Sequence, residues 1–221
     1  MFSKYWKKII SVVLALTLLL QITPLAVRAE ETLPENLECD PQTGLSQLYE
    51  HIPFDAGMAG TAYLNTYLGN LHIRRSDLYL GGERMPVEIE FYHDPANDVS
   101  NNPYGAGWST SYNQLISYDS QSGKFAYKDA NGTWIYFVRS DEQNPGFVVW
   151  KEDAEYGVGE IGLKLYIPEA VSEQTYSAVR IVNGENNYFF DSYGRLLRIV
   201  NGANTITVAY VSNTNKINYI Q

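Results

Sequence analysis

The sequence predicts an all-β protein built from serial antiparallel hairpins that form an open, curved sheet. Two observations predict this fold class. Beyond about residue 60, apolar and polar residues alternate with a period of two, as at Val87–Tyr92 and Thr205–Tyr210. Three Asn-Gly dipeptides mark hairpin turns, at Asn131-Gly132, Asn183-Gly184 and Asn201-Gly202. They predict type I′ turns, in which both central residues need a positive φ.

The composition fits this fold class and excludes others. The chain has 221 residues, with 18 Tyr and 17 Gly, which suit half-buried strands joined by tight turns. A hydrophobic fraction of 45% excludes a wholly disordered chain. With 25 acidic and 16 basic residues the net charge is −9, which argues against electrostatic binding of nucleic acid.

The first residues have the features of a secretory signal peptide. Lysines precede an apolar run over Ile9–Leu20, and Val27 and Ala29 place small residues before a cleavage site. We predict a signal peptide over 1–29, with a retained membrane anchor as the alternative. Cleavage leaves 12 basic and 25 acidic residues, a net charge of −13. The mature protein is therefore expected to be secreted or associated with the cell wall.

A flexible leader with a short helix is predicted over 30–57. The leader is acidic and contains proline. Four of its apolar residues have the spacing of one helix face, namely Leu45, Leu48, Tyr49 and Ile52. Pro53 is expected to end that helix. Cys39 is the one cysteine of the chain, so no internal disulfide forms.

A repeated turn motif follows a β region that we predict over 58–180. Tyr188–Leu196 has the form Tyr-x-aromatic-Asp-x-x-Gly-Arg-Leu, the frame recurs at Tyr210–Ile217, and Tyr118–Phe125 is an earlier echo. Each copy is one hairpin that must stack on its neighbours to bury its apolar face. We therefore assign 181–221 to repeat hairpins.

Each residue type in the motif has a physical role. The Tyr ends a strand, and the Asp or Asn accepts backbone N–H groups in the turn. The Gly, or Asn215 in the second copy, supplies a positive φ. The base then faces water and the next apolar residue faces the core. The motif residues are Tyr188, Asp191, Gly194, Arg195, Leu196, Tyr210, Asn213, Asn215 and Lys216.

The motif and the segments before it resemble the Rhs/YD-repeat family of large exported bacterial proteins. The resemblance is carried by Asn65–Leu71, Asp77–Gly82, Met85–Ile89 and Pro103–Ser109, followed by Tyr188–Leu196. It implies a β-shell whose repeats enclose a C-terminal toxin in full-length relatives. For this chain it implies a non-enzymatic segment of such a shell, without a cofactor. The expected partners are further YD repeats or a partner chain along the C-terminal edge.

The last residues still alternate as a strand. Ile217, Tyr219 and Ile220 are apolar or aromatic, with polar residues between and after them. This pattern predicts a fragment, a truncated product or one part of a split protein.

The sequence offers few candidates for chemistry. The three histidines, His51, His72 and His93, lack zinc-type spacing, so we predict no metal site and no catalysis. Glu88 and Glu90 share one face of a strand. A glycoside hydrolase with these carboxylates is therefore one alternative, and a solvent-facing strand is the simpler interpretation.

Two further motifs are open to alternative interpretations. Asp129–Gly132 resembles the start of a calcium loop, but Ser140 stands where the last acidic ligand belongs, so a plain hairpin is preferred. Trp108 is expected to anchor the core. Trp134 and Trp150 are candidates for stacking on sugars, which makes a cell-wall or carbohydrate-binding module the second functional hypothesis.

Overall fold

A computed structural model describes residues 50–82, 85–95, 103–154 and 161–221. The predicted signal peptide, Cys39 and most of the predicted helix lie outside these ranges. The described residues form an all-β fold, as predicted, with two 3-10 helices, η1 (Gly57–Ala59) and η2 (Tyr176–Ala178). In these ranges, no helix has the length and apolar character needed to cross a membrane.

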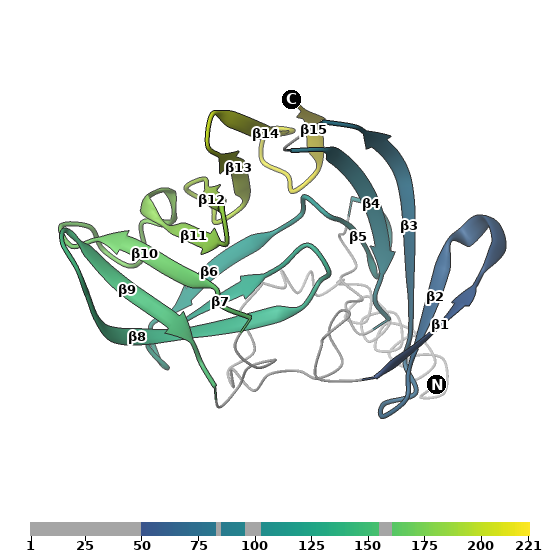
Figure 1. The fold of residues 1–221 in the computed structure, drawn as a ribbon, viewed down its shortest axis with the longest axis horizontal. Helices are drawn as coiled ribbons and strands as arrows, with labels where there is room; N and C mark the ends of the chain where they lie inside the picture. The colour runs from purple at the N-terminus through teal and green to yellow at the C-terminus, as the bar shows by residue number, and fades with distance from the viewer. Residues whose placement is uncertain (1–49, 83–84, 96–102, 155–160) are drawn as a thin grey trace, which may run out of the picture. The chain divides into compact units, whose positions relative to one another are not determined.

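The strands form two antiparallel sheets (Figure 1). The five-stranded sheet has the order β1-β2-β3-β4-β5. Its strands are β1 (His51–Asp55), β2 (Thr61–Asn65), β3 (Leu71–Leu80), β4 (Val87–His93) and β5 (Trp108–Thr110). Each strand pairs with the next along the chain, as serial hairpins require.

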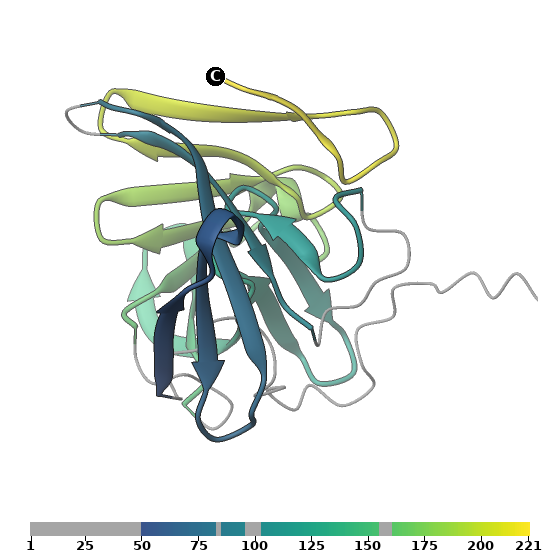
Figure 2. The same cartoon turned by 90° about the vertical axis from the view of Figure 1, so that its right-hand side faces the viewer.

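The ten-stranded sheet has the order β15-β14-β13-β12-β11-β10-β9-β8-β7-β6. Its first five strands are β6 (Leu115–Asp119), β7 (Lys124–Lys128), β8 (Trp134–Asn144), β9 (Phe147–Glu152) and β10 (Lys164–Pro168). The others are β11 (Arg180–Asn183), β12 (Asn186–Phe190), β13 (Leu196–Asn201), β14 (Asn204–Tyr210) and β15 (Ile217–Ile220). Figure 2 shows this ladder ending in the yellow C-terminal hairpin at the top of the view.

Strand β1 lies inside the stretch that we assigned to the leader. Ile52, which we placed in a short helix, pairs with Leu64 of β2, and Pro53 pairs with Tyr63. Proline fits here because β1 is an edge strand of its sheet. The apolar spacing at Leu45–Ile52 therefore misled the helix prediction at Ile52, while its other residues lie outside the described ranges.

All three Asn-Gly dipeptides lie in hairpins, as predicted, but Asn131-Gly132 lies in a longer turn between β7 and β8. The other two form two-residue turns that are not of type I′. Asn183 pairs with Asn186, and Asn201 pairs with Asn204. The glycines therefore occupy the first central position, with φ values of 58° at Gly184 and 57° at Gly202. The second central residues do not have a positive φ. A positive φ at the first position alone is typical of a type II′ turn.

The ten-stranded sheet curls so that β6 meets the start of β13. Leu115 of β6 forms an antiparallel bridge with Arg195, and the Leu196 N–H donates to the Gln114 carbonyl oxygen over 3.0 Å. The sheet is open, as predicted, and its inner face forms the core. The largest fully buried side chains in this core are Phe125, Phe137, Phe190, Ile135, Leu165, Ile167, Ile181 and Leu196.

We predicted that the alternation of apolar and polar residues in β4 gives the strand one buried face and one solvated face. The structure does not show this separation. Val87 and Ile89 pack against the core of the ten-stranded sheet. Tyr92, on the face that we expected to be solvated, is 4% exposed. The turn between β7 and β8 covers Tyr92, because a Cβ at Gly132 would lie 2.6 Å from its ring. Both faces of β4 therefore contact the rest of the protein.

We predict that Leu165→Ala lowers the free energy of unfolding by about 2–5 kcal/mol, because the fully buried side chain leaves a cavity. Urea denaturation followed by far-UV circular dichroism measures this loss. Leu71→Ala is the control, since Leu71 is 41% exposed, and it should cost well under half as much. Equal losses in the two variants would contradict the assignment of the core.

Candidate interface at the repeat turns

The Asp191–Arg195 turn joins β12 to β13, and we call it the first repeat turn. The Oδ1 atom of Asp191 accepts hydrogen bonds from the N–H groups of Tyr193 (2.9 Å) and Arg195 (3.0 Å). Its Oδ2 atom accepts a 2.8 Å hydrogen bond from Nε of Arg195. The carboxylate therefore fastens the turn, as the motif predicts, and it is largely shielded from water.

Gly194 allows the first repeat turn to lie directly against β6. Its φ is 78°, in the region that favours glycine. Its N–H bonds the Asp191 carbonyl, and its own carbonyl oxygen accepts a 2.7 Å hydrogen bond from the Ile116 N–H. A Cβ at Gly194 would lie 2.1 Å from the Ile116 carbonyl oxygen. Both the backbone conformation and the close approach therefore require glycine.

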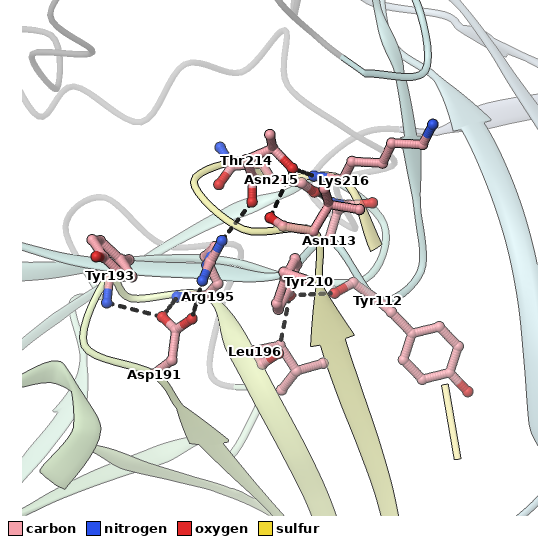
Figure 3. Close-up of polar contacts among 11 residues, drawn as sticks. Tyr112, Asn113, Asp191, Tyr193, Arg195, Leu196, Tyr210, Thr214, Asn215 and Lys216 are labelled. Carbon is pink, nitrogen blue, oxygen red and sulfur yellow. Dashed lines mark hydrogen bonds and ion pairs between the residues drawn. The ribbon is translucent and has the colours of Figure 1, made fainter. Parts of the chain in front are cut away.

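We predicted that Arg195 faces water, and this prediction is wrong. Its side chain instead links the first repeat turn to the next hairpin (Figure 3). Its side chain is 14% exposed and pairs with Asp191. Its Nη1 donates a hydrogen bond to the Thr214 carbonyl oxygen. The guanidinium carbon lies 4.3 Å from the ring centroid of Tyr210, within the range of a cation–π interaction.

Two tyrosines of the motif lie inside this arrangement. The Tyr210 hydroxyl donates a 2.9 Å hydrogen bond to the Leu196 carbonyl oxygen, and burial raises the pKa of that hydroxyl. Leu196 itself is fully buried, as predicted. Tyr188 lies within β12 rather than at its end, and burial also raises its pKa. The two copies of the motif are thus packed together through Arg195, Leu196 and Tyr210.

The second repeat turn, Val211–Lys216, differs from the first in the residue with a positive φ. We had predicted this conformation for Asn215, but Asn213 has it, with a φ of 58°. The reason is turn length, since the Val211 N–H bonds the carbonyl five residues later at Lys216. In the first repeat turn this bond spans four residues. Asn215 instead offers its carbonyl oxygen to the Asn113 amide over 3.0 Å.

The Asp129–Thr133 turn between β7 and β8 has the same construction as the first repeat turn, and we call it the interface turn. Asp129 Oδ1 accepts from the N–H groups of Asn131 (2.8 Å) and Thr133 (2.9 Å). The Asp129 N–H bonds the Thr133 carbonyl, and Gly132 has a φ of 80°. We did not predict this equivalence, although the spacing Asp-x-x-Gly occurs at both sites.

The interface turn lies where the two sheets meet. It covers Tyr92 of β4, and it is shielded from solvent enough that burial raises the pKa of Asp129 to about 6. The N–H groups of Asn131 and Thr133 oppose this shift, since they stabilise the charged form. At Tyr118–Phe125, the third occurrence of the motif, Asp119 accepts hydrogen bonds from the Gln121 and Ser122 N–H groups. A hydrogen bond from the Ser122 side chain, followed by that from the Gln121 N–H, lowers the pKa of Asp119.

The structure brings His51 and His72 together although they lie far apart in the sequence. Their ring centroids are 5.9 Å apart, and Nδ1 of His72 lies 3.7 Å from Oδ1 of Asp94. Burial lowers the pKa of His72, although Asp94 opposes the shift. His93 lies against Trp108 instead, with ring centroids 5.2 Å apart. Among the described residues, no group of three or more His, Cys, Asp or Glu side chains is arranged to hold a metal ion.

The carboxylates of Glu88 and Glu90 contact side chains of β3. Glu90 forms a bidentate pair with Arg74, with both hydrogen bonds at 2.7 Å. Glu88 accepts a 3.0 Å hydrogen bond from the Ser76 hydroxyl. These are cross-strand contacts of a sheet face. Both glutamates are half-buried, so the prediction that they face solvent is wrong.

The tryptophans differ in exposure. Trp150, a candidate for stacking on sugars, is 3% exposed and packs edge-on against Phe125, with centroids 4.9 Å apart. It is therefore a core residue, contrary to that prediction. Trp134 and Trp108 are both half-buried, and Trp108 of β5 packs against His93 of β4. Trp108 is not among the buried core residues, contrary to the prediction.

Comparison with known proteins finds no family model, no curated protein and no solved structure that matches this chain.

We predict that Gly194→Ala destabilises the protein far more than Gly184→Ala. Both glycines have a positive φ, which costs a non-glycine residue about 1–2 kcal/mol. Only at Gly194 does the new Cβ meet backbone, since nothing lies within 4 Å of one at Gly184. Denaturation midpoints of the two variants measure the difference. Equal midpoints would show that the first repeat turn does not need its close approach to β6.

We also predict that Asp129→Asn raises the free energy of unfolding, by an amount that depends on pH. An Asn Oδ1 can still accept both N–H groups of the turn but carries no charge. In the folded protein the pKa of Asp129 is about 6, above the usual 3.8. Above pH 6 the carboxylate is charged in both the folded and the unfolded protein, and its burial lowers the stability of the fold by the full amount. This loss of stability disappears as the pH falls toward 3.8, because the folded protein then binds the proton. The variant should therefore be more stable than the wild type at neutral pH, with the advantage lost under acid.

Urea denaturation at several pH values measures this difference. The lowered pKa of His72 has the opposite effect on the pH dependence of stability. The free energy of unfolding falls as the pH falls below 6.5, because the unfolded protein then binds a proton that the folded protein does not. Since both proteins contain His72, its contribution cancels in the comparison. A stability difference that is the same at every pH would contradict the prediction.

Proposed function

We propose that this protein is a non-enzymatic structural module that extends a curved β-ladder by accepting a further strand at the outer edge of β15. The partner is either more YD-type repeats or a separate chain with a free strand. This role agrees with the resemblance to Rhs/YD-repeat proteins, in which repeats build a shell. The observation that carries the proposal is the edge of β15, with which no described strand pairs, together with the turns that hold successive hairpins in register. At the start of β15, the Ile217 N–H already donates a 3.1 Å hydrogen bond to the Tyr104 hydroxyl.

Alternate residues of β15 direct their backbone N–H and C=O groups toward β14 or away from it. Ile220 is one of the residues whose groups point away from β14. Thr207 and Gln221 exchange both backbone hydrogen bonds, at 2.7 and 2.9 Å. In an antiparallel ladder the next pair, Val208 with Ile220, is not hydrogen-bonded. The N–H and C=O groups of Ile220 therefore point away from β14. In the part of the chain that the structure describes, no strand pairs with this edge.

The opposite end of the fold is protected against strand addition. On either side of β1, the Glu50 carbonyl oxygen accepts a hydrogen bond from the Thr66 N–H, and the Ala56 N–H donates one to the Gly60 carbonyl oxygen. Because hydrogen-bonded and non-hydrogen-bonded pairs alternate along the β1–β2 ladder, the Pro53–Tyr63 pair is not hydrogen-bonded. The nitrogen of Pro53 therefore points away from β2. Because proline has no N–H, it disfavours pairing along this edge. Strand addition is therefore disfavoured at β1, whereas Ile220 of β15 directs its N–H and C=O groups outward.

The repeat turns supply the register for such growth. Arg195 of one hairpin contacts the turn and the tyrosine of the next. Lys216 occupies the corresponding place in the second copy of the motif. A following hairpin with the same pattern would offer Lys216 a carbonyl and an aromatic ring. Together with the predicted signal peptide, this arrangement supports a structural role outside the cell.

We predict that the mature chain self-associates through β15 and that Ile220→Pro abolishes this association. Proline removes the outward N–H without removing a hydrogen bond to β14. Ile220→Ala is the matched control, because it loses the same side chain but keeps the N–H group. Sedimentation velocity over a concentration series measures the oligomeric state. The wild type and the alanine variant should dimerise, and the proline variant should remain monomeric.

A wild-type protein that is monomeric at every concentration would remove the support for this role. Dimerisation of the proline variant with unchanged affinity would show that another surface is responsible. Circular dichroism spectra of all three proteins verify that each one is folded.

A further inference from the structure

The outer face of strands β10–β14 is basic, although the chain as a whole is acidic. These five strands contain three charged residues, Lys164, Arg180 and Arg198, and no Asp or Glu. Each of the three immediately precedes a residue of the hydrophobic core in its own strand, so its side chain lies on the opposite, outer face. The chain has 25 acidic and 16 basic residues, and this face therefore differs in charge from the composition.

The strand register places the two arginines in one row with aromatic residues. Arg180 of β11 pairs with Tyr166 of β10 on one side and with Phe189 of β12 on the other. Phe189 in turn pairs with Arg198 of β13. Side chains at paired positions lie on the same face of a sheet. Aromatic and basic side chains therefore alternate across four neighbouring strands, β10–β13.

Each of the two guanidinium groups lies on an aromatic ring. The Cζ atom of Arg180 is 4.8 Å from the ring centroid of Tyr166 and 5.4 Å from that of Phe147. The Cζ atom of Arg198 is 4.5 Å from the ring centroid of Phe189. These distances are within the range of cation–π interactions. The rings restrain the guanidinium groups without neutralising their charge.

Neither arginine of this row forms an ion pair with a residue that the structure describes. The buried Nε of Arg180 also has no hydrogen-bond partner there. By contrast, Arg74, Arg75 and Arg195 each pair with a carboxylate. Arg180 and Arg198 can therefore pair with an external anion without breaking an ion pair of the fold.

The spacing of these two charges distinguishes between classes of anionic polymer. Arg180 and Arg198 belong to strands that flank β12, so their backbones lie about 9–10 Å apart. Duplex nucleic acid carries one charge per about 1.7 Å of its axis, far more than two cations at this spacing can match. A polyuronate has only one carboxylate per sugar ring. A guanidinium group matches a planar carboxylate with two parallel N–H···O hydrogen bonds.

We propose that the outer face of β10–β13 binds an extended acidic polysaccharide whose carboxylates pair with Arg180 and Arg198. The polymer runs across the strands, along the row of aromatic and basic side chains. Tyr166 and Phe189 position the guanidinium groups rather than stacking on the sugars. This proposal goes beyond the structural role and does not rest on it, because it uses the face of the sheet and not the edge of β15.

The test compares three probes by isothermal titration calorimetry with the mature chain. The probes are hexagalacturonate, the neutral cellohexaose, and a single-stranded oligothymidylate as a polyanion of higher charge density. We expect hexagalacturonate to bind and cellohexaose not to bind measurably at about 5 mM, a concentration at which even millimolar affinity is detected. The oligothymidylate should bind about tenfold more weakly than hexagalacturonate, or not at all.

Variants test the two arginines. Arg198→Gln should lower the affinity for hexagalacturonate about tenfold, because one of the two ion pairs is lost. The double variant Arg180→Gln/Arg198→Gln should abolish binding. Arg75→Gln is the matched control and should bind as the wild type does. Arg75 also lies over an aromatic ring, 5.7 Å from the centroid of Phe91, but it is in the five-stranded sheet and pairs with Asp77.

Three results would overturn the proposal. The first is no binding of hexagalacturonate by the wild type at about 5 mM, and the second is binding that Arg198→Gln leaves unchanged. The third is binding of cellohexaose or oligothymidylate as tight as that of hexagalacturonate, since recognition would then not depend on spaced carboxylates. Thermal unfolding of each variant verifies that lost binding is not lost folding. Because Arg198 is exposed, the single variant decides the outcome even where the double variant is unstable.

Discussion

The close approach between Gly194 and Ile116 holds the curled sheet together. At this point the first repeat turn and β6 are separated by less than the space that a methyl group needs. The backbone hydrogen bonds on either side of Gly194 then join β6 to the start of β13. The core residues of the ten-stranded sheet are enclosed because this contact bends the ladder back toward its first strand.

The same turn construction serves a second contact elsewhere. At the interface turn, Asp129 fastens the backbone and Gly132 lies against Tyr92. The turn thereby joins the ten-stranded sheet to the five-stranded sheet. A carboxylate acceptor and a glycine three residues later make a compact turn whose glycine side has no side chain. Such a turn can dock on a carbonyl oxygen or on an aromatic ring, and this chain uses it for both.

The proposed role as a shell segment depends on the contacts between the two repeat turns. Arg195 joins the hairpins through its guanidinium group, which is largely shielded from solvent. The proposed polysaccharide site uses other arginines, because Arg180 and Arg198 lie on the outer face of the ladder without a carboxylate partner among the described residues.

Much of this architecture follows from local sequence. Alternation and turn residues are properties of neighbouring residues, so the all-β class, the serial hairpins and the roles of Asp191, Gly194 and Leu196 were predictable. Contacts between distant segments set the rest. The burial of Tyr92, Trp150 and Arg195 depends on what packs over them, and the positive φ at Asn213 follows from the length of its turn. No pattern confined to one strand records which surface will lie opposite, because that surface comes from elsewhere in the chain.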